Sequence, residues 1–181
     1  MSADRANPEM PRRVFHEQDL AAIYRLRVEA WSTRINAIDF FQDGRWSDEY
    51  DATALHWGIK KSAAMIASAR LNMSSDINAL PYGSAISGYV EGLIAPYFML
   101  SRLVVAPCAR NQGYSRLFDK VRLQTVLDHG RGTAFVMTSN GIRTENLLRL
   151  GFRQVSGSGA FDTFPGGKST LFAIPYNDIK I

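Results

Sequence analysis

The residues with the clearest chemical potential lie in a polar loop, Arg110 to Ser115, in the second half of the chain. The loop follows a nearly continuous apolar run, Tyr97 to Val105, and precedes a segment with helical periodicity. A helix that begins there presents unpaired backbone N–H groups and the positive end of its dipole. Because Gly113 lets the backbone approach a ligand closely, the loop is a candidate site for a pyrophosphate.

Basic residues surround this loop, although the formal net charge of the 181-residue chain is only +4. A cluster of this kind suits an anionic partner, such as a phosphorylated cofactor, an acidic carrier protein or a nucleic acid. Nucleic acid is the least favoured of the three, because no Lys/Arg block is interleaved with aromatic residues. The cluster comprises Arg102, Arg110, Arg116, Lys120, Arg122, Arg131, Arg143, Arg149 and Arg153.

Other common chemistries find little support in the sequence. Cys108 is the single cysteine, so no intrachain disulfide can form, and no pattern pairs this thiol with a histidine and a third orienting group. The three histidines, His16, His56 and His129, lack the spacing of metal ligands, so no metal site is expected. The Gly-x-Gly-x-x-Gly and Gly-Lys-Ser/Thr phosphate motifs are also absent from the sequence.

Periodicity and turn residues predict a single α+β domain over residues 1–181, with 1–11 as a flexible tail. The run from Tyr97 to Ser139 predicts a right-handed parallel crossover, and the central mixed sheet has six or seven strands flanked by helices. No apolar run is long enough for a membrane span and no signal peptide is evident, so a cytoplasmic location is expected. The predicted strands are 12–15, 53–59, 63–71, 97–105, 133–139, 152–155 and 169–174, and the predicted helices are 20–31, 115–129 and 142–150.

Boundary residues and one long insertion complete this prediction. Asp19 is expected to cap the first helix, Gly130 to end the second, and Gly151 to adopt a left-handed conformation after the third. The second helix is expected to bury a face that contains Leu117, Phe118 and Val121. Residues 72–95 predict a long excursion with short helical pieces, and residues 32–51 give no clear pattern.

The loop and its flanks resemble a motif of the GNAT acyltransferases. Val105-Ala106-Pro107 is followed by Arg110-x-x-Gly113-x-Ser115, and Leu150-Gly151-Phe152 follows near a later strand. Ser115 stands where the family has Gly or Ala, which is an exchange of one small residue for another. The resemblance implies a GNAT-like fold and acetyl-CoA, a longer acyl-CoA or the phosphopantetheine of an acyl carrier protein as co-substrate. It assigns cofactor contacts to Leu103, Val104, Val105, Arg110, Asn111, Gln112, Gly113, Tyr114 and Ser115.

A second resemblance, to the autoinducer synthases and N-acyl amino acid synthases, covers the first half. Its motifs are Arg27 with Trp31, then Trp46, Asp48 and Asp51, then Ala69-Arg70-Leu71, and finally Ser101-Arg102. These families share the GNAT core but take long acyl chains. The insertion at 72–95 also falls where they have one. The resemblance implies catalytic roles for Asp48, Arg70 and Arg102.

The chain departs from both patterns at the positions of the usual proton-transfer residues. Met99 replaces the Glu of Glu-x-Ser-Arg, and Leu147 replaces the Tyr four residues before the Gly of Leu-Gly-Phe. The candidates for a base are then Asp48 first, with Asp51 and Glu91 as alternatives. Arg70 and Arg102 either hold the acidic pair or bind a substrate carboxylate.

Aromatic and methionine side chains either wall an acyl tunnel or form ordinary core. They are Trp31, Phe40, Phe41, Trp46, Tyr97 and Phe98, with Met65, Met73, Met99 and Met137. The sequence therefore predicts an N-acyltransferase that moves an acyl group directly from acyl-CoA or acyl carrier protein to a primary amine, such as an amino acid or its derivative. The alternative is a GNAT-like module that senses CoA or docks a carrier protein without turnover. The acceptor and the oligomeric state are left open.

Overall fold

The computed structural model describes residues 9–32, 41–139, 141–164 and 167–181. These residues form an eight-stranded sheet with the order β1-β2-β3-β4-β5-β8-β6, and β7 pairs with β8 at its side. The strands are β1 (Arg12–Val14), β2 (Leu55–Lys61), β3 (Ala64–Ser74), β4 (Tyr97–Val105), β5 (Thr133–Thr138), β6 (Arg153–Gln154), β7 (Phe161–Phe164) and β8 (Gly167–Pro175). The α-helices are α1 (Glu17–Trp31), α2 (Gly83–Ile86), α3 (Tyr114–His129) and α4 (Gly141–Arg149).

The sheet is mixed, and its single parallel pair among the described strands lies at its centre. β4 and β5 run parallel and are connected through α3, as the predicted crossover requires. The other neighbouring strands pair antiparallel. The predicted fold class, a mixed α/β sheet flanked by helices, is confirmed.

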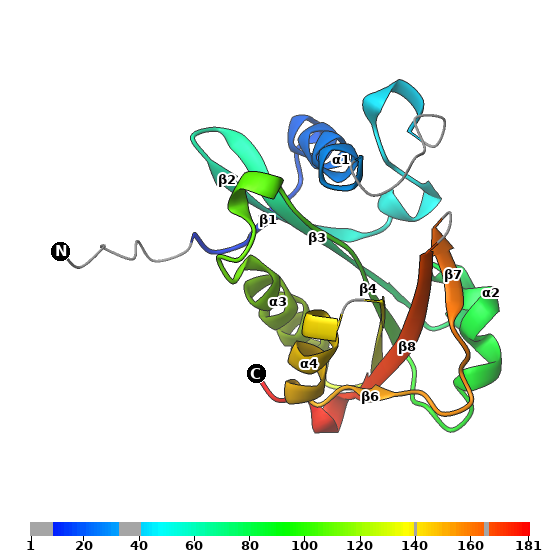
Figure 1. Ribbon diagram of the computed structural model, residues 1–181. Coiled ribbons are helices and arrows are strands. Elements are labelled where there is room, and N and C mark those ends of the chain that lie inside the picture. The colour runs from blue at the N-terminus through cyan, green and yellow to red at the C-terminus, as the bar shows by residue number, and fades with distance from the viewer. Residues whose placement is uncertain (1–8, 33–40, 140, 165–166) are drawn as a thin grey trace.

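Helices cover both faces of the central strands. Figure 1 shows α1 on one side of the sheet and α3 with α4 on the other. β4 is therefore buried from two sides, which explains its nearly continuous apolar sequence. The main core contains Ile23, Leu26 and Ala30 from α1, Phe118, Leu123 and Val126 from α3, and Leu71, Leu100, Ala134 and Phe172 from the sheet.

The insertion after β3 builds a second, smaller core. Ile77, Leu80 and Ile86 pack with residues of β4, β5 and β8, including Met99 and Phe135. The ring of Tyr89 meets that of Phe161 edge to face at 5.8 Å, which joins the insertion to β7, and Figure 1 shows α2 beside β7. The predicted short helical pieces are confirmed, although β3 continues to Ser74 before the excursion begins.

The predicted start of the first helix and the predicted end of the second strand are wrong. α1 begins at Glu17, so Asp19 lies inside its first turn and forms an ion pair with Lys60 instead of capping the helix. β2 runs to Lys61, and the hairpin turns at Ser62 and Ala63, which have positive φ values of 49° and 68°. This left-handed pair matches the twist of the strands.

The helix ends agree with the sequence. α3 ends at His129 with Gly130 as its left-handed C-cap, and Gly151 has a φ of 103°. The unpredicted strand is β7, whose sequence Phe-Asp-Thr-Phe does not alternate between apolar and polar residues. No α-helix among the described residues is both long and apolar enough to cross a membrane.

Candidate functional site

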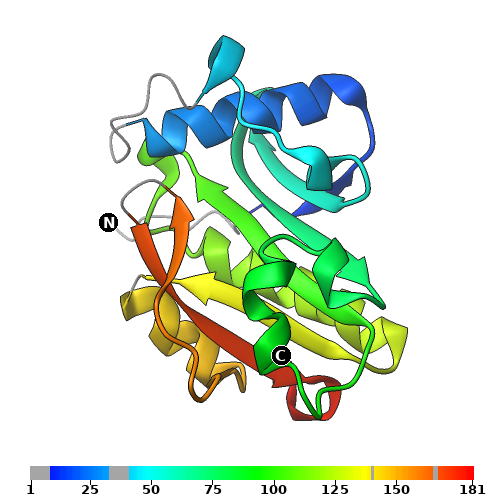
Figure 2. The same ribbon diagram turned by 90° about the vertical axis from the view of Figure 1, so that its right-hand side faces the viewer.

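A β-bulge in β4 opens the centre of the sheet. Arg70 of β3 lies opposite Ser101 and Ser68 lies opposite Val104, so β4 contains one residue more than β3 between these pairs. Arg102, within this interval, has a φ of 51°. A bulge bends and twists its strand. Pairing between β4 and β5 accordingly ends at Leu100 and Val136, and Figure 2 shows the tips of β4 (green) and β5 (yellow) well apart.

A cavity of about 410 Å³ occupies this fork. Residues of β4 beyond Leu100 line it, and in the described structure β5 no longer pairs with them. An unpaired strand edge can bind an extended ligand through its N–H and C=O groups. The predicted contacts Leu103, Val104 and Val105 all lie on this wall. The other walls include Val136–Ser139, Asn111 and Ser115, Ile142, Arg143 and Asn146, and Trp31, Trp46 and Tyr82.

The predicted cofactor loop lies at one end of the cavity. Gly113 precedes α3 with a φ of 81°, and no side chain caps the helix N-terminus. The first turn of this 16-residue helix therefore has no side-chain acceptor for its N–H groups, and Asn111 and Ser115 beside it line the cavity. A Cβ atom at Gly113 would meet no atom within 4 Å, so the glycine is required for its backbone conformation and not for space.

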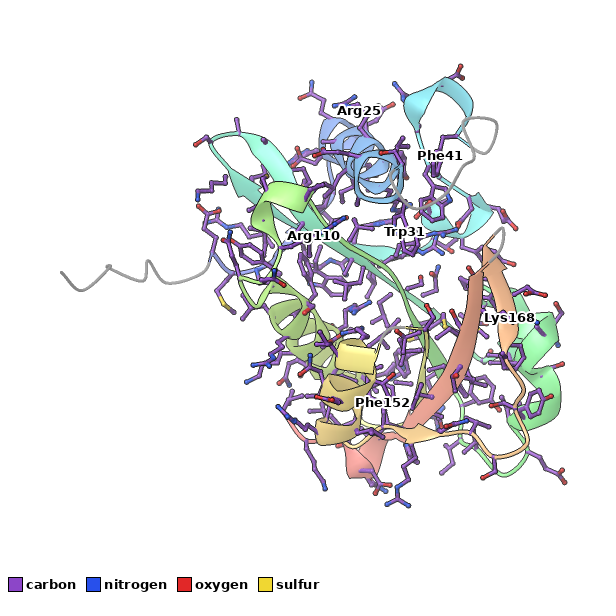
Figure 3. All side chains as sticks on the ribbon, in the orientation of Figure 1. Arg25, Trp31, Phe41, Arg110, Phe152 and Lys168 are labelled. Carbon is purple, nitrogen blue, oxygen red and sulfur yellow. The ribbon has the colours of Figure 1, made fainter. Side chains whose placement is uncertain are left out.

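The remaining loop residues have supporting positions. Arg110 Nη2 donates a hydrogen bond to the Ala30 carbonyl at 3.0 Å, which fastens the loop to the end of α1. Figure 3 shows Arg110 and Trp31 in the layer between α1 and the strands. Tyr114 is buried in the main core, and Gln112 lies in the turn before Gly113. Among the predicted side chains of this loop, Asn111 and Ser115 reach the cavity.

The three predicted catalytic residues belong to one ion-pair network, which we call the Asp48 cluster: Arg27, Asp48, Asp51, Arg70 and Arg102. Arg27 contacts both carboxylate oxygens of Asp51, at 2.8 and 2.9 Å. Arg70 Nη1 lies 2.9 Å from Asp51 Oδ1 and also contacts Asp48. Arg102 Nη2 donates to Asp48 Oδ2 at 2.6 Å.

Local backbone structure holds the two aspartates of the Asp48 cluster. A 3-10 turn, Glu49–Asp51, follows Asp48, and the two aspartates form a reciprocal capping box. Tyr50 N donates to Asp48 Oδ1 at 3.1 Å, and Asp48 N donates to Asp51 Oδ2 at 2.9 Å. Asn72 of β3 donates to the Tyr50 carbonyl at 2.8 Å, which ties the turn to the sheet.

Electrostatics keep both aspartates ionised. Burial raises the pKa of Asp51, but the hydrogen bonds and charge of Arg27 and the charge of Arg70 outweigh it and lower that pKa to about 2. Burial likewise opposes ionisation of Asp48, and Arg70 with Arg102 holds its pKa below the ordinary value. Burial lowers the pKa of His56, whose Nε2 lies 3.0 Å from the Asp51 carbonyl oxygen.

The Asp48 cluster consequently presents a cation to the cavity. Three arginines and two aspartates leave one excess positive charge. Arg102 lines the cavity, and its guanidinium carbon lies 4.2 Å from the centre of the Trp46 ring. The lowered pKa of Asp48 makes this carboxylate a weak proton acceptor. No observation tests its predicted role as a base, which stays a prediction.

A second ion-pair network, the Asp119 cluster, was not predicted from the sequence: Asp119, Arg122 and Arg143. Arg122 Nη2 and Arg143 Nη2 each donate to Asp119 Oδ1 at 2.7 Å, and Arg143 Nη1 contacts Oδ2. The side chains of Asp119 and Arg122 are fully buried. Burial lowers the pKa of Arg122 to about 10 despite the charge of Asp119, so the guanidinium stays charged at neutral pH.

The Asp119 cluster touches the apex of the fork. Arg122 Nη1 donates to the carbonyl oxygens of Arg70 at 3.2 Å and Ser101 at 3.3 Å, the pair that precedes the bulge. At its other end, Arg143 of α4 lines the cavity. The network thus connects the backbone of β4 before the bulge to the α4 residues that line the cavity.

The cavity walls carry no Asp, Glu or His among the residues that the structure describes. Met99 and Leu147, at the usual family positions for proton transfer, are buried in apolar surroundings. Glu91 is exposed in a turn after the second core, and Cys108 is exposed on the turn after β4. Within the described ranges, no group of three His, Cys, Asp or Glu side chains is placed to hold a metal ion.

The aromatic residues divide into two groups. Trp31 and Trp46 line the cavity and meet edge to face at 6.0 Å, with Phe41 packed on Trp46 at 5.4 Å. Tyr97 packs on Phe135 and Phe98 packs on His129, so for these two the alternative of ordinary core holds. Phe40 lies outside the described residues. Met99 and Met137 line the cavity, whereas Met73 is exposed and Met65 belongs to the main core.

Solved structures show which fold this is. FeeM, an N-acyl amino acid synthase from uncultured soil microbes, superposes with a TM-score of 0.70 at 14% identity over 93% of this chain and 91% of that one. The AHL synthase LasI gives 0.66 at 15% identity over 93% and 88%. The ribosomal-protein-S18-alanine N-acetyltransferase of Escherichia coli gives 0.62 at 18% identity over 92% and 94%.

The chain has the GNAT fold. No protein-family model matches the sequence, and no curated protein matches it either. The structures that match include N-acetyltransferases as well as N-acyl amino acid and AHL synthases. A CoA-dependent acyl-homoserine lactone synthase, BjaI, in a structure with SAM and isopentyl-CoA, also matches, with a TM-score of 0.70 at 14% identity over 92% of this chain and 83% of that one.

Proposed function

We propose that the protein is an N-acyltransferase that moves an acyl group from a phosphopantetheine thioester to an amine. The observation that carries the proposal is the fork in the sheet, whose unpaired β4 edge leads from the cavity to the uncapped N-terminus of α3. The β4 edge suits the amide-rich pantetheine arm, and the helix N-terminus suits its phosphate. Acyl-CoA and acyl carrier protein share this arm, so both are candidate donors.

The transfer is direct in this proposal. A neutral amine attacks the thioester carbonyl, whose oxygen accepts hydrogen bonds from backbone N–H groups of the β4 edge. The amide forms as the C–S bond breaks, and the thiol leaves. An acyl-enzyme is not required, because Cys108 is exposed outside the cavity lining. The ammonium proton passes to water, since the described cavity walls supply no carboxylate or imidazole.

We further propose that the acceptor is an amino acid or a derivative that keeps its carboxylate. Arg102 places a guanidinium on the cavity wall, and the Asp48 cluster behind it has one excess positive charge. A guanidinium binds a carboxylate with short, charge-assisted hydrogen bonds. FeeM, which shares the fold, is described as an N-acyl amino acid synthase, and this agrees with such an acceptor.

A second candidate is a module that binds acyl-CoA or docks a carrier protein without turnover. The observation that favours it is the lack of any Asp, Glu or His on the described cavity walls. Attack on a thioester can proceed without such a group, because it needs a neutral amine and an aligned, polarised carbonyl. The enzyme is therefore the first candidate, and turnover decides between the two.

The first experiment is thermal unfolding of the protein alone, with acetyl-CoA and with a long-chain acyl-CoA. A ligand at 100 times its dissociation constant adds about 2.7 kcal/mol to the unfolding free energy. For a chain of this length the melting temperature should rise by roughly 5–10 °C. Stabilisation by the long chain alone indicates a long acyl donor, and no shift with either leaves acyl carrier protein as the donor to test.

The second experiment measures thiol release from the stabilising donor with a panel of amino acids and their decarboxylated amines. Release that depends on an amino acid supports the enzyme. Binding of the donor with no release across the panel supports the binding module. Release with decarboxylated amines alone overturns the proposed carboxylate contact.

A further inference from the structure

The bulge in β4 places two successive side chains on the same face of the sheet. Arg70 Nε donates to Ser101 Oγ at 3.0 Å, and Arg102 Nη2 donates to Asp48 Oδ2 at 2.6 Å. Because Arg70 and Asp48 also contact each other, Ser101 and Arg102 both face the Asp48 cluster. Successive side chains of a regular strand point to opposite faces. The extra residue of β4 therefore turns Arg102 toward the Asp48 cluster.

The extra residue also decides which backbone groups of β4 are open to the cavity. Along an antiparallel pair, one residue exchanges N–H···O bonds with the partner strand, and the next directs these groups to the other side. β4 pairs with β3 on one side, and beyond Leu100 its other side borders the fork. Without the bulge, Ser68 would lie opposite Leu103 and not opposite Val104. A slip of one residue would thus exchange the groups that face β3 with those that face the fork.

One buried guanidinium joins the two strands at the last pair before the bulge. Arg122 Nη1 donates to the carbonyl oxygens of Arg70 at 3.2 Å and Ser101 at 3.3 Å. Its other two nitrogens are also held, because Nε donates to the Phe118 carbonyl at 3.2 Å and Nη2 donates to Asp119 at 2.7 Å. A guanidinium is planar and its donors point in fixed directions. These contacts therefore fix the two strand backbones relative to each other and to α3.

Packing and stability give little reason for an arginine at this position. The Arg122 side chain is fully buried, so its ordering costs rotamer entropy and its charge costs solvation energy. A buried ion pair often contributes no more stability than apolar side chains of similar volume. An apolar side chain could not supply charge-assisted hydrogen bonds to the carbonyls of two strands. The place of these carbonyls beside the bulge indicates that the arginine maintains the shape of the fork.

We propose that Arg122 is a positioning residue for the acyl donor, because it fixes the register at the bulge and thereby the backbone groups that β4 presents to the fork. The described cavity walls do not include Arg122, so it acts through the backbone of Arg70 and Ser101. Its role in donor binding rests on the proposed transferase function, whereas its role in the register does not.

The test compares two variants of Arg122 with a control on the same helix. Arg122→Met keeps an unbranched side chain but removes every donor, and it leaves Asp119 paired with Arg143. Arg122→Lys keeps the charge, but a single ammonium replaces the planar guanidinium. Val126→Ala, one turn further along α3, removes buried apolar volume and no hydrogen bond, so it should lower the urea midpoint alone.

The register is measured first, by NMR of the free proteins. Cross-strand contacts should place Ser68 opposite Val104 in the wild type and in Val126→Ala. In Arg122→Met a second set of contacts should place Ser68 opposite Leu103, and Arg122→Lys should show a smaller share of this set. An unchanged register in Arg122→Met overturns the proposal. If that variant does not fold by circular dichroism, Arg122→Lys takes its place and must show the second set.

Donor binding is measured second, by titration calorimetry at a temperature where every variant is folded. The Kd for the acyl-CoA that stabilises the wild type should rise about tenfold in Arg122→Met, the order expected when a misdirected backbone group loses one hydrogen bond. It should stay within about twofold in Val126→Ala, since that variant keeps the fork. A changed register with an unchanged Kd overturns the role in donor binding.

Failure of the proposed function would look different. If the wild type binds neither acetyl-CoA nor the long-chain acyl-CoA, the same titration is made with acyl carrier protein loaded with the acyl group. If no donor binds, the proposed transferase function fails, while the NMR comparison still decides whether Arg122 holds the bulge.

Discussion

Two buried ion-pair networks flank the same bulge, and they are built differently. The Asp48 cluster joins α1, a 3-10 turn, β3 and β4, and its aspartates are fixed by backbone N–H groups. The Asp119 cluster joins α3 and α4, and Asp119 is held by guanidinium groups. Arg70 and Arg122 bring the two networks to neighbouring backbone positions, because Arg122 donates to the Arg70 carbonyl while the Arg70 side chain belongs to the other cluster.

One arginine of each network lines the cavity: Arg102 of the Asp48 cluster and Arg143 of the Asp119 cluster. A buried ion pair is seldom a strong source of stability, because desolvation offsets the attraction. Such networks hold charges in fixed places. The comparison teaches that in both networks buried acids hold arginine side chains that line the cavity.

The largest expected effect comes from removing the central acid of either cluster. Asp51→Asn leaves Arg27 buried without its charge partner, and Asp119→Asn does the same to Arg122, so each should cost about 3–5 kcal/mol of unfolding free energy. Urea unfolding followed by circular dichroism measures both. Asp128→Asn, at an exposed position on α3, is the control and should change the free energy by less than about 0.5 kcal/mol. A small loss of unfolding free energy in Asp51→Asn or Asp119→Asn would show that the remaining arginines of that cluster become hydrated.

Lowering the pH should isolate the contribution of the Asp51 carboxylate to the free energy of unfolding. The pKa of Asp51 is lowered to about 2 in the folded protein, below its ordinary value of about 3.9 in the unfolded chain. Between these values the unfolded state binds more protons, so stability rises with pH there. The contribution, about 2–3 kcal/mol, is complete above about pH 5 and is lost progressively as the pH falls to about 1. The wild-type and Asp51→Asn proteins should therefore converge in urea midpoint as the pH falls through this window, and parallel curves would contradict the assignment.

A smaller effect is expected on the KM for the acceptor when Arg102 is replaced. Arg102→Gln should raise the KM for a carboxylate-bearing acceptor by about tenfold, since one charge-assisted hydrogen bond is worth about 1.5–3 kcal/mol. The KM for the acyl donor should hardly change, and a decarboxylated amine should react equally well with both proteins. Steady-state kinetics with each substrate varied in turn measures this. An equal loss with the decarboxylated amine would give Arg102 a positioning role instead.

The sequence predicts the two sides of the site unequally. Asp48, Arg70 and Arg102 were found through a family resemblance, and their attraction brings them together in the fold. The Asp119 cluster was missed because the buried face of α3 was predicted from apolar residues. That prediction favoured Leu117 and Val121, which are partly buried, whereas Asp119 and Arg122 are fully buried. Apolar periodicity cannot detect charges that are buried as pairs.

The fork itself could not be predicted from the sequence either. The apolar run of β4 predicts a strand with the observed bounds, Tyr97–Val105, but a bulge depends on register with β3. Glycine often marks a bulge, but neither Arg102 nor a neighbouring residue is a glycine. The cofactor loop was easier to find, because Gly113 and the helix that follows are local features.

The smallest effect concerns that loop. Gly113→Val places a β-branched residue at a φ of 81°, which costs about 1–2 kcal/mol of backbone strain although no neighbouring atom obstructs the side chain. Gly157→Val is the matched control, since Gly157 has a φ of 73° with equally open surroundings in a turn far along the chain. Both variants should lose similar unfolding free energy in urea. Only Gly113→Val should weaken acyl-CoA binding, measured by the ligand-induced rise in melting temperature, because the side chain alters the approach to the first turn of α3. Equal binding by the two variants would mean that the pyrophosphate does not sit at this helix end, and the donor would then be held by the β4 edge alone.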